Sequence, residues 1–152
     1  MGSLTVAQIK TRVTTQFGDT DGAQIVDASV VNWVNDAMRE ITQQQDLLQK
    51  VGTSSSVASQ AQYNLPADVL HIRRLAYSGF ALQQITIEDA NNLLPGNSQS
   101  VSQGYPTGTP TSYWIYANQI NLYPAPDSSI ASGITIYYTR QPIPVESTED
   151  TP

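Results

Sequence analysis

The chain has 152 residues, with seven basic against thirteen acidic side chains and a formal net charge of −6. This length favours one domain, or one domain with a small appendage, and the absence of cysteine excludes disulfides, thiolate metal ligands and cysteine nucleophiles. The acidic balance argues against a protein whose main task is to grip phosphate backbones.

The first 50 residues predict a helical hairpin. Thr5 and Gln8 have the spacing of a capping box, so a first helix should cover 6–17 and end at Gly18. A second helix should follow the loop at 18–22, with Asp27 or Ser29 as its cap. Its apolar stripe is the strongest helical pattern in the sequence and consists of Val30, Val31, Trp33, Val34, Ala37, Met38, Ile41 and Leu48.

Residues 51–142 predict an antiparallel β lobe. Segments 69–77 and 80–85 should form one hairpin around Ser78-Gly79, and segments 113–116 and 119–123 a second one. The alternating segment 134–140 should then extend the second hairpin into a meander. Thr86 is placed to cap a short helix near 87–94.

Two segments lack a regular pattern. Residues 97–112 are rich in Ser, Thr, Gly and Pro and predict a long exposed loop. Residues 143–152 form an acidic, Pro-containing tail that we expect to be extended or disordered. The order of the elements favours an α+β fold, with the helical hairpin beside a small meander-like or sandwich-like β lobe.

Candidate catalytic residues are few. His71 is the only histidine, and pairing it with Glu88 or Asp89 would give a small hydrolase, but no G-x-S-x-G elbow occurs and Asp89 is better explained as a cap partner. Residues 19–22 resemble the start of a calcium loop without its remaining ligands. We therefore expect no enzymatic activity, no cofactor and no metal.

Arginine and aromatic residues suggest two binding hypotheses. Arg73, Arg74 and Arg140 lie near tyrosines, but in an acidic chain they are better explained as solvated or paired with carboxylates of a neighbouring subunit than as a nucleic-acid surface. An alternative function is a carbohydrate-binding or tail-fibre module. It would stack sugars on Tyr113, Trp114, Tyr116 and Tyr123.

Four segments, in this order, resemble the head-to-tail adaptor proteins of tailed bacteriophages, also called connector or tail tubular proteins. They are 31–41 (VNWVNDAMREI), 63–72 (YNLPADVLHI), 108–114 (GTPTSYW) and 120–127 (INLYPAPD) before 134–138 (ITIYY). Each motif is short, and together they cover most of residues 25–142. The ordered set is what makes the resemblance specific.

The resemblance implies a structural virion protein of the phage neck, made in the host cytoplasm. It implies a homo-oligomeric ring, usually a dodecamer, that docks beneath the portal protein and extends the DNA channel. A downstream tail or nozzle protein would attach to it, and its contact with DNA would be passive. We expect neither a secretion signal nor a membrane span, since no apolar run is long enough.

Loops that lack internal support are candidates for subunit contacts, because binding offsets the entropy of ordering them. On this basis, the residues expected at partner interfaces come from the 97–112 loop and from the segment that enters the tail. They are Tyr105, Thr107, Thr111, Pro142, Pro144 and Val145.

Overall fold

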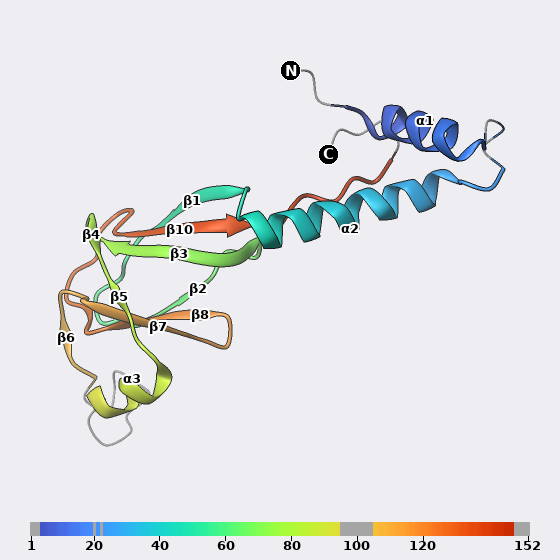
Figure 1. The fold of residues 1–152 in the computed structure, drawn as a ribbon. Coiled ribbons are helices and arrows are strands. Elements are labelled where there is room, and N and C mark those ends of the chain that lie inside the picture. The colour runs from blue at the N-terminus through green and yellow to red at the C-terminus, as the bar shows by residue number, and fades with distance from the viewer. Residues whose placement is uncertain (1–3, 20, 22, 95–104, 148–152) are drawn as a thin grey trace. The chain divides into compact units, whose positions relative to one another are not determined.

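The computed structural model describes residues 4–19, 21, 23–94 and 105–147. The chain divides into a helical unit, residues 1–48 with 141–152, and a sheet unit, residues 49–140 (Figure 1). Among the described residues two helices precede the strands along the chain and a short third helix lies between strands, so the predicted α+β class is confirmed.

The helical unit contains α1 (Val6–Phe17) and α2 (Asp27–Gln45). The predicted capping box at the start of α1 is present: the Gln8 amide N–H donates to the Thr5 hydroxyl, and the Gln8 side chain accepts from the Thr5 N–H. Gly18 ends α1 with φ of 73°, a left-handed conformation in which a residue with Cβ is strained.

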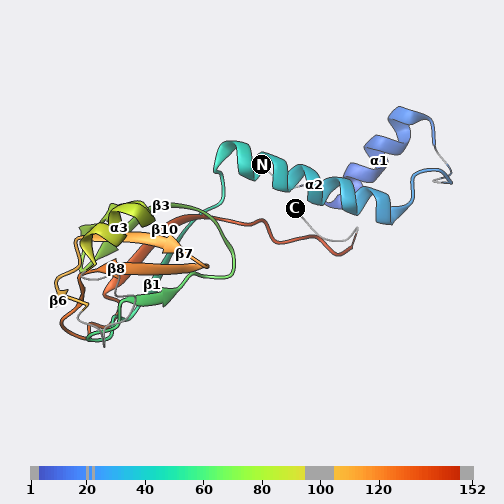
Figure 2. The ribbon, with the colours of Figure 1, turned by 90° about the horizontal axis from the view of Figure 1, so that it is seen from below.

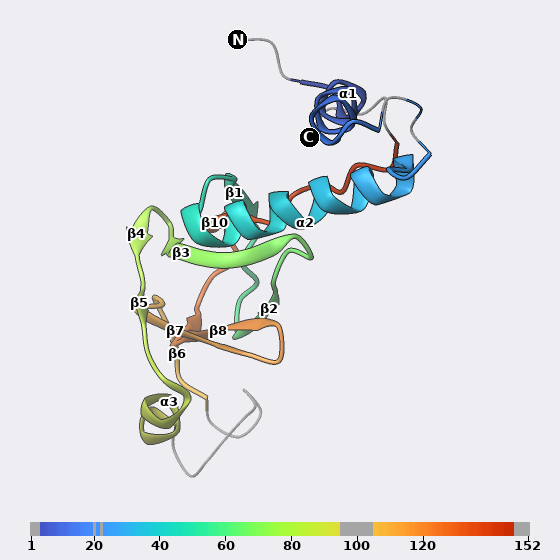
Figure 3. The ribbon, with the colours of Figure 1, turned by 45° about the vertical axis from the view of Figure 1, so that its right-hand side comes forward.

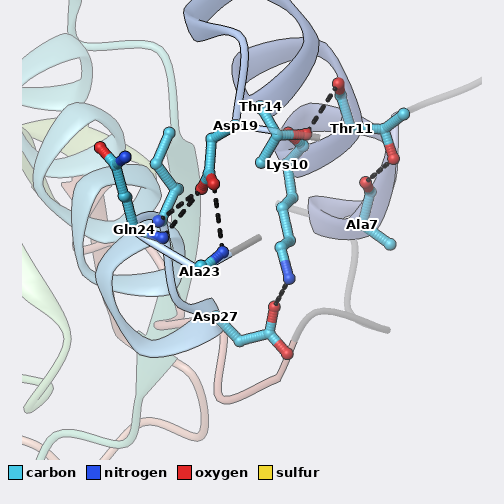
Figure 4. Close-up of polar contacts among 9 residues, drawn as sticks. Ala7, Lys10, Thr11, Thr14, Asp19, Ala23, Gln24 and Asp27 are labelled. Carbon is cyan, nitrogen blue, oxygen red and sulfur yellow. Dashed lines mark hydrogen bonds and ion pairs between the residues drawn. The ribbon is translucent and has the colours of Figure 1, made fainter. Parts of the chain in front are cut away.

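The loop between the helices is held by Asp19, whose carboxylate accepts the backbone N–H groups of Ala23, Gln24 and Ile25 (Figure 4). The prediction that Asp27 or Ser29 caps α2 is wrong. Val26 is the N-cap and makes no side-chain cap bond. Asp27 is instead the first helical residue and forms an ion pair with Lys10 of α1.

The core of the helical unit is small and consists of Val6 from α1, Val30 and Val34 from α2, and Val145 from the tail. Figures 1 and 2 both show residues 141–147 running alongside α2 as an extended strand-like segment. Figure 3 looks almost along α1 while α2 lies across the view, so the two contacting helices cross at an angle.

The sheet unit has two four-stranded sheets. The first sheet has the order β1 (Gln49–Ser54), β10 (Ile134–Arg140), β3 (Val69–Tyr77) and β4 (Phe80–Ala81). The second has the order β2 (Gln62–Asn64), β8 (Gln119–Tyr123), β7 (Ser112–Tyr116) and β5 (Gln83–Gln84). A small parallel pair joins β6 (Thr107–Gly108) to β9 (Ala125–Pro126). The pairs within the four-stranded sheets are antiparallel except β5 with β7.

The two four-stranded sheets pack face to face in Figures 1 and 3, with the main core between them. The buried residues of this core are Tyr63, Leu75, Tyr77, Leu82, Tyr113, Ile120, Leu122, Ile134, Ile136 and Tyr138. Helix α3 (Ile87–Leu93) lies on the other face of the second sheet, where a second cluster is formed by Ala61, Ala90, Leu94, Tyr105, Trp114 and Ala125. The sheet unit is thus a sandwich with one covering helix.

Two strand predictions are wrong in their partners. Segment 134–140 does not extend the 113–123 hairpin as a meander. It pairs with β1 and β3 in the other sheet. Segment 80–85 also divides, since Phe80–Ala81 pair with β3 and Gln83–Gln84 pair with β7. The chain passes from the first sheet to the second between Ala81 and Gln83. Leu82, at this passage, is buried in the core between the sheets.

The prediction of one exposed loop over 97–112 is wrong for its described part. Residues 97–104 lie outside the described residues, whereas Tyr105 and Pro110 are buried. Thr107–Gly108 form β6, because the Ala125 N–H donates to Pro106 O and the Asp127 N–H donates to Gly108 O.

Candidate functional site

A pocket of about 490 Å³ lies in the sheet unit beside α3. Among the described residues its lining is aromatic, aliphatic, hydroxyl-bearing and amide-bearing, without a charged side chain. These residues are Ser59, Gln60, Ala61, Gln62, Ile87, Asn91, Leu94, Tyr105, Trp114, Tyr116 and Asn121. Amides and hydroxyls supply hydrogen bonds and fix orientation, but they provide no general acid or base. The described lining is therefore suited to binding an uncharged polar group.

The four aromatic residues predicted to stack sugars are mostly committed to the fold. Tyr113 is buried and its hydroxyl donates to Gln84 Oε1, while burial raises its pKa. The Tyr123 hydroxyl donates to Leu93 O, and Trp114 is buried in the cluster beneath α3. Only Tyr116 of this set, at 63% exposed, presents a free ring. This arrangement does not favour the carbohydrate-binding alternative.

Three of the predicted interface residues lie in the sheet unit. Tyr105 is buried, and its hydroxyl donates to Leu122 O over 2.7 Å, so desolvation raises the pKa of this phenol. Thr107 in β6 and Thr111 before β7 are exposed. The Thr111 N–H donates to Tyr123 O, which fixes the backbone and leaves the side chain at the surface.

The other three lie in the segment beside α2. Val145 is buried among Val6, Val30 and Val34, and its backbone is bonded on both sides by the Asn35 amide. Pro142 is half-buried and Pro144 is exposed. The structure therefore places the six predicted residues in two separate groups, one in each unit, with Tyr105 and Val145 packed inside the chain.

The charges are distributed unequally between the two units. The helical unit carries three basic and nine acidic residues, a formal charge of −6, whereas the sheet unit carries four of each and is neutral. Within the sheet unit three of the four cations, Arg73, Arg74 and Arg140, belong to the adjacent strands β3 and β10. Sequence reasoning singled out these arginines but could not place them on one sheet.

A polar cluster that the sequence analysis missed joins Lys50, Asp68 and Tyr138. Lys50 Nζ lies 2.8 Å from Asp68 Oδ2, and the Tyr138 hydroxyl donates to Asp68 Oδ1 over 2.9 Å. The Lys50 bond holds the pKa of the Asp68 carboxyl below its usual range, and Asp68 in turn raises the pKa of Lys50. The cluster connects β1, β10 and the turn before β3.

The residues considered for catalysis are not brought into one site. His71 is an exposed residue of β3, opposite Thr139 of β10, whereas Glu88 and Asp89 occupy the first turn of α3, which packs against β7. The Asp89 N–H donates to the Thr86 hydroxyl, and this hydroxyl donates to the Asp89 carboxylate. Asp89 thus acts in the helix cap, as the T-x-x-D spacing predicts.

No group of three or more His, Cys, Asp or Glu side chains that could hold a metal ion occurs in residues 4–19, 21, 23–94 and 105–147. Within the same ranges no helix has the length and apolar character needed to cross a membrane.

Comparison with known families gives one assignment. The model of the SU10 adaptor protein family matches residues 4–152, which is nearly the whole chain and includes both units. No curated protein matches the sequence.

Proposed function

The chain belongs to the SU10 adaptor protein family, a family of phage adaptors, and from this membership we propose that it is a head-to-tail adaptor of the virion neck. In this proposal the protein forms a homo-oligomeric ring, a dodecamer, that docks beneath the portal protein and extends the DNA channel. A downstream tail or nozzle protein attaches to the ring. The observation that carries the proposal is the match of the family model to residues 4–152.

The charge of the chain supports a passive contact with DNA. Phosphates gain nothing from carboxylates, and the helical unit alone carries a formal charge of −6. A channel wall of this character lets DNA slide without binding it.

A structural and non-enzymatic role agrees with the separation of His71 from the α3 carboxylates and with the uncharged lining of the pocket. The protein is made in the host cytoplasm and acts in the assembled particle.

The partner interfaces of the ring include the six residues predicted from the sequence. Thr107, Thr111, Pro142 and Pro144 offer surface to a neighbour. Tyr105 and Val145 are buried and contribute indirectly, because their hydrogen bonds hold the backbone on either side of those surface residues in place.

The test is the mass of the purified full-length chain, alone and mixed with the portal ring of the same phage, by mass photometry. The expected result is a ring, or a portal particle heavier by many copies of the chain. Thr111→Arg and Pro144→Arg should reduce portal binding or ring closure, while Thr11→Arg on the exposed side of α1 serves as the control. A chain that stays monomeric and does not bind the portal contradicts the proposal.

A further inference from the structure

Helix α2 has an apolar face wider than the part that its own unit covers. Val30 and Val34 are buried against Val6 and Val145. Trp33 and Ile41, at i and i+8 on one side of the same helix, remain 53% and 50% exposed. These two side chains are therefore available for a contact outside the helical unit.

Carboxylates border this exposed edge. Glu40 is seven residues after Trp33 and so lies two turns along the same line, with Asp36 on its outer side. Asp36 pairs with Arg39, but Glu40 makes no ion pair with any residue that the structure describes and accepts only the Gln44 amide. The edge thus combines two large apolar side chains with an acid that has no basic partner.

The outer face of the first sheet combines exposed apolar side chains with a basic one. The register places Val51, Tyr137 and Arg74 side by side on β1, β10 and β3, and residues paired in this way point to the same face. Their strand neighbours Leu75 and Ile136 point into the core. Val51 is 55% exposed, and the Arg74 guanidinium lies 5.5 Å from the centre of the Tyr137 ring. Among the described residues Arg74 has no carboxylate partner.

We propose that this outer face, the Val51–Tyr137–Arg74 row, binds the Trp33–Ile41 edge of α2 from a second copy of the chain, with Arg74 paired to Glu40 of the partner subunit. The proposal rests on the proposed function and names the contact by which copies join. In this contact the apolar side chains Trp33 and Ile41 of one copy face Val51 and Tyr137 of the other, and Arg74 faces Glu40. A helix laid on a sheet face is also a common packing layer.

The charges of the units favour this head-to-tail arrangement over others. Helical units that carry −6 each repel one another, whereas the neutral sheet unit with Arg74 on its outer face does not repel the helical unit of a neighbour. A contact between unlike surfaces repeats from copy to copy and closes into a ring when the rotation allows. Double-stranded DNA is a less suitable occupant, since the exposed Val51 side chain has no polar group for a phosphate to bind.

Chemical cross-linking tests the contact directly, because the chain contains no cysteine. Glu40→Cys and Arg74→Cys variants are prepared as full-length proteins, mixed and treated with a short bismaleimide. The expected result is a covalent dimer in the mixture and little in either variant alone. Arg12→Cys, an exposed position of α1, replaces Glu40→Cys in the control mixture. A single chain carrying both Glu40→Cys and Arg74→Cys that cross-links within itself at high dilution overturns the proposal.

Charge reversal gives an independent readout by sedimentation velocity. Arg74→Glu and Glu40→Arg should each weaken self-association at least tenfold. An equimolar mixture of these two variants should recover assembly, because alternating copies place a native Glu40–Arg74 pair at one contact and the reversed pair at the next. The double variant Arg74→Glu/Glu40→Arg should assemble to within about threefold of the unchanged chain. Arg12→Glu changes the net charge by the same amount and should have little effect.

The outcomes separate this contact from the proposed function. If the unchanged chain assembles or binds the portal while Arg74→Glu behaves the same, the contact is wrong and the adaptor function stands. If Arg74→Glu reduces retention on DNA and leaves assembly intact, Arg74 serves DNA binding and the contact is again wrong. If the chain neither assembles nor binds the portal, both proposals fail.

Discussion

Asn35 and Val145 are 110 residues apart in the chain and exchange two hydrogen bonds, the Asn35 side-chain amide donating to Val145 O and the Val145 N–H donating to Asn35 Oδ1. The Asn35 side-chain amide thus bonds both the N–H and the C=O of Val145, as the backbone of a neighbouring β-strand would. The Val145 side chain is thereby held in the valine core between α1 and α2.

Asn35→Ala should destabilise the helical unit by about 1–3 kcal/mol, because it leaves a half-buried backbone N–H and C=O without their partners. Val145→Ala should cost about 2 kcal/mol through lost burial. Urea unfolding followed by circular dichroism at 222 nm measures both. Ile143→Ala changes a residue of the same segment that is 72% exposed, and a comparable loss there would contradict this account.

Tyr105→Phe should cost about 1–2 kcal/mol, because the change keeps the ring in its cluster and removes only the hydroxyl that bonds to Leu122 O. Burial also raises the pKa of Tyr105 above that of an unfolded tyrosine, so the neutral form stabilises the fold and this contribution is lost as pH rises above about 10. Thermal unfolding at pH 7 and pH 10.5 should show a smaller alkaline loss for Tyr105→Phe. An equal loss would exclude Tyr105 as the group responsible.

Asp68 should make the sheet unit sensitive to acid. Its folded pKa lies below the unfolded value of about 3.8, so the stabilisation is present above that pH and disappears as pH falls through the folded pKa. The pair with Lys50 is exposed, and the effect on Tm should be small and reduced by salt. Asp68→Asn should lower Tm at pH 7 and have a smaller effect at pH 2.5. Asp127→Asn, outside the cluster, is the matched control.

Trp114 and Tyr116 distinguish a structural role from sugar binding. Trp114→Ala should cost about 3–5 kcal/mol because the indole is buried beneath α3, whereas Tyr116→Ala should stay within about 0.5 kcal/mol. A glycan array probed with both variants and the unchanged chain supplies the second readout. Binding that is present in the unchanged chain and lost in Tyr116→Ala would support the carbohydrate-binding alternative.

Local signals in the sequence located the helices well. The capping box at Thr5, the left-handed Gly18 and the cap at Thr86 each depend on residues within a few positions of one another, and all three are present. The hairpin turn at Ala117-Asn118, where both residues have positive φ, is of the same kind. Such features follow from backbone geometry and need no knowledge of the rest of the fold.

Long-range pairing was not predictable in the same way. Strand β1 lies at the edge of its sheet and is mostly exposed. Its sequence includes Gln49, Lys50 and Gly52, so it lacks the alternation of apolar residues that marks a strand. The apolar stripe of α2 predicted a helix correctly but not how much of the stripe its own unit covers, and Trp33 remained exposed. Periodicity reports which face is apolar, while the partner of that face depends on the tertiary structure.

The helical unit is discontinuous in sequence, because the 92 residues of the sheet unit separate Leu48 from Gln141. Docking Val145 onto α2 in a chain whose sheets were unfolded would require closing a loop of that length, at an entropic cost on the order of 4 kcal/mol. Pairing of Gln49 with Thr139 brings the two ends of the loop together once β1 and β10 have formed. We therefore expect residues 141–147 to dock on α2 only after β1 has paired with β10.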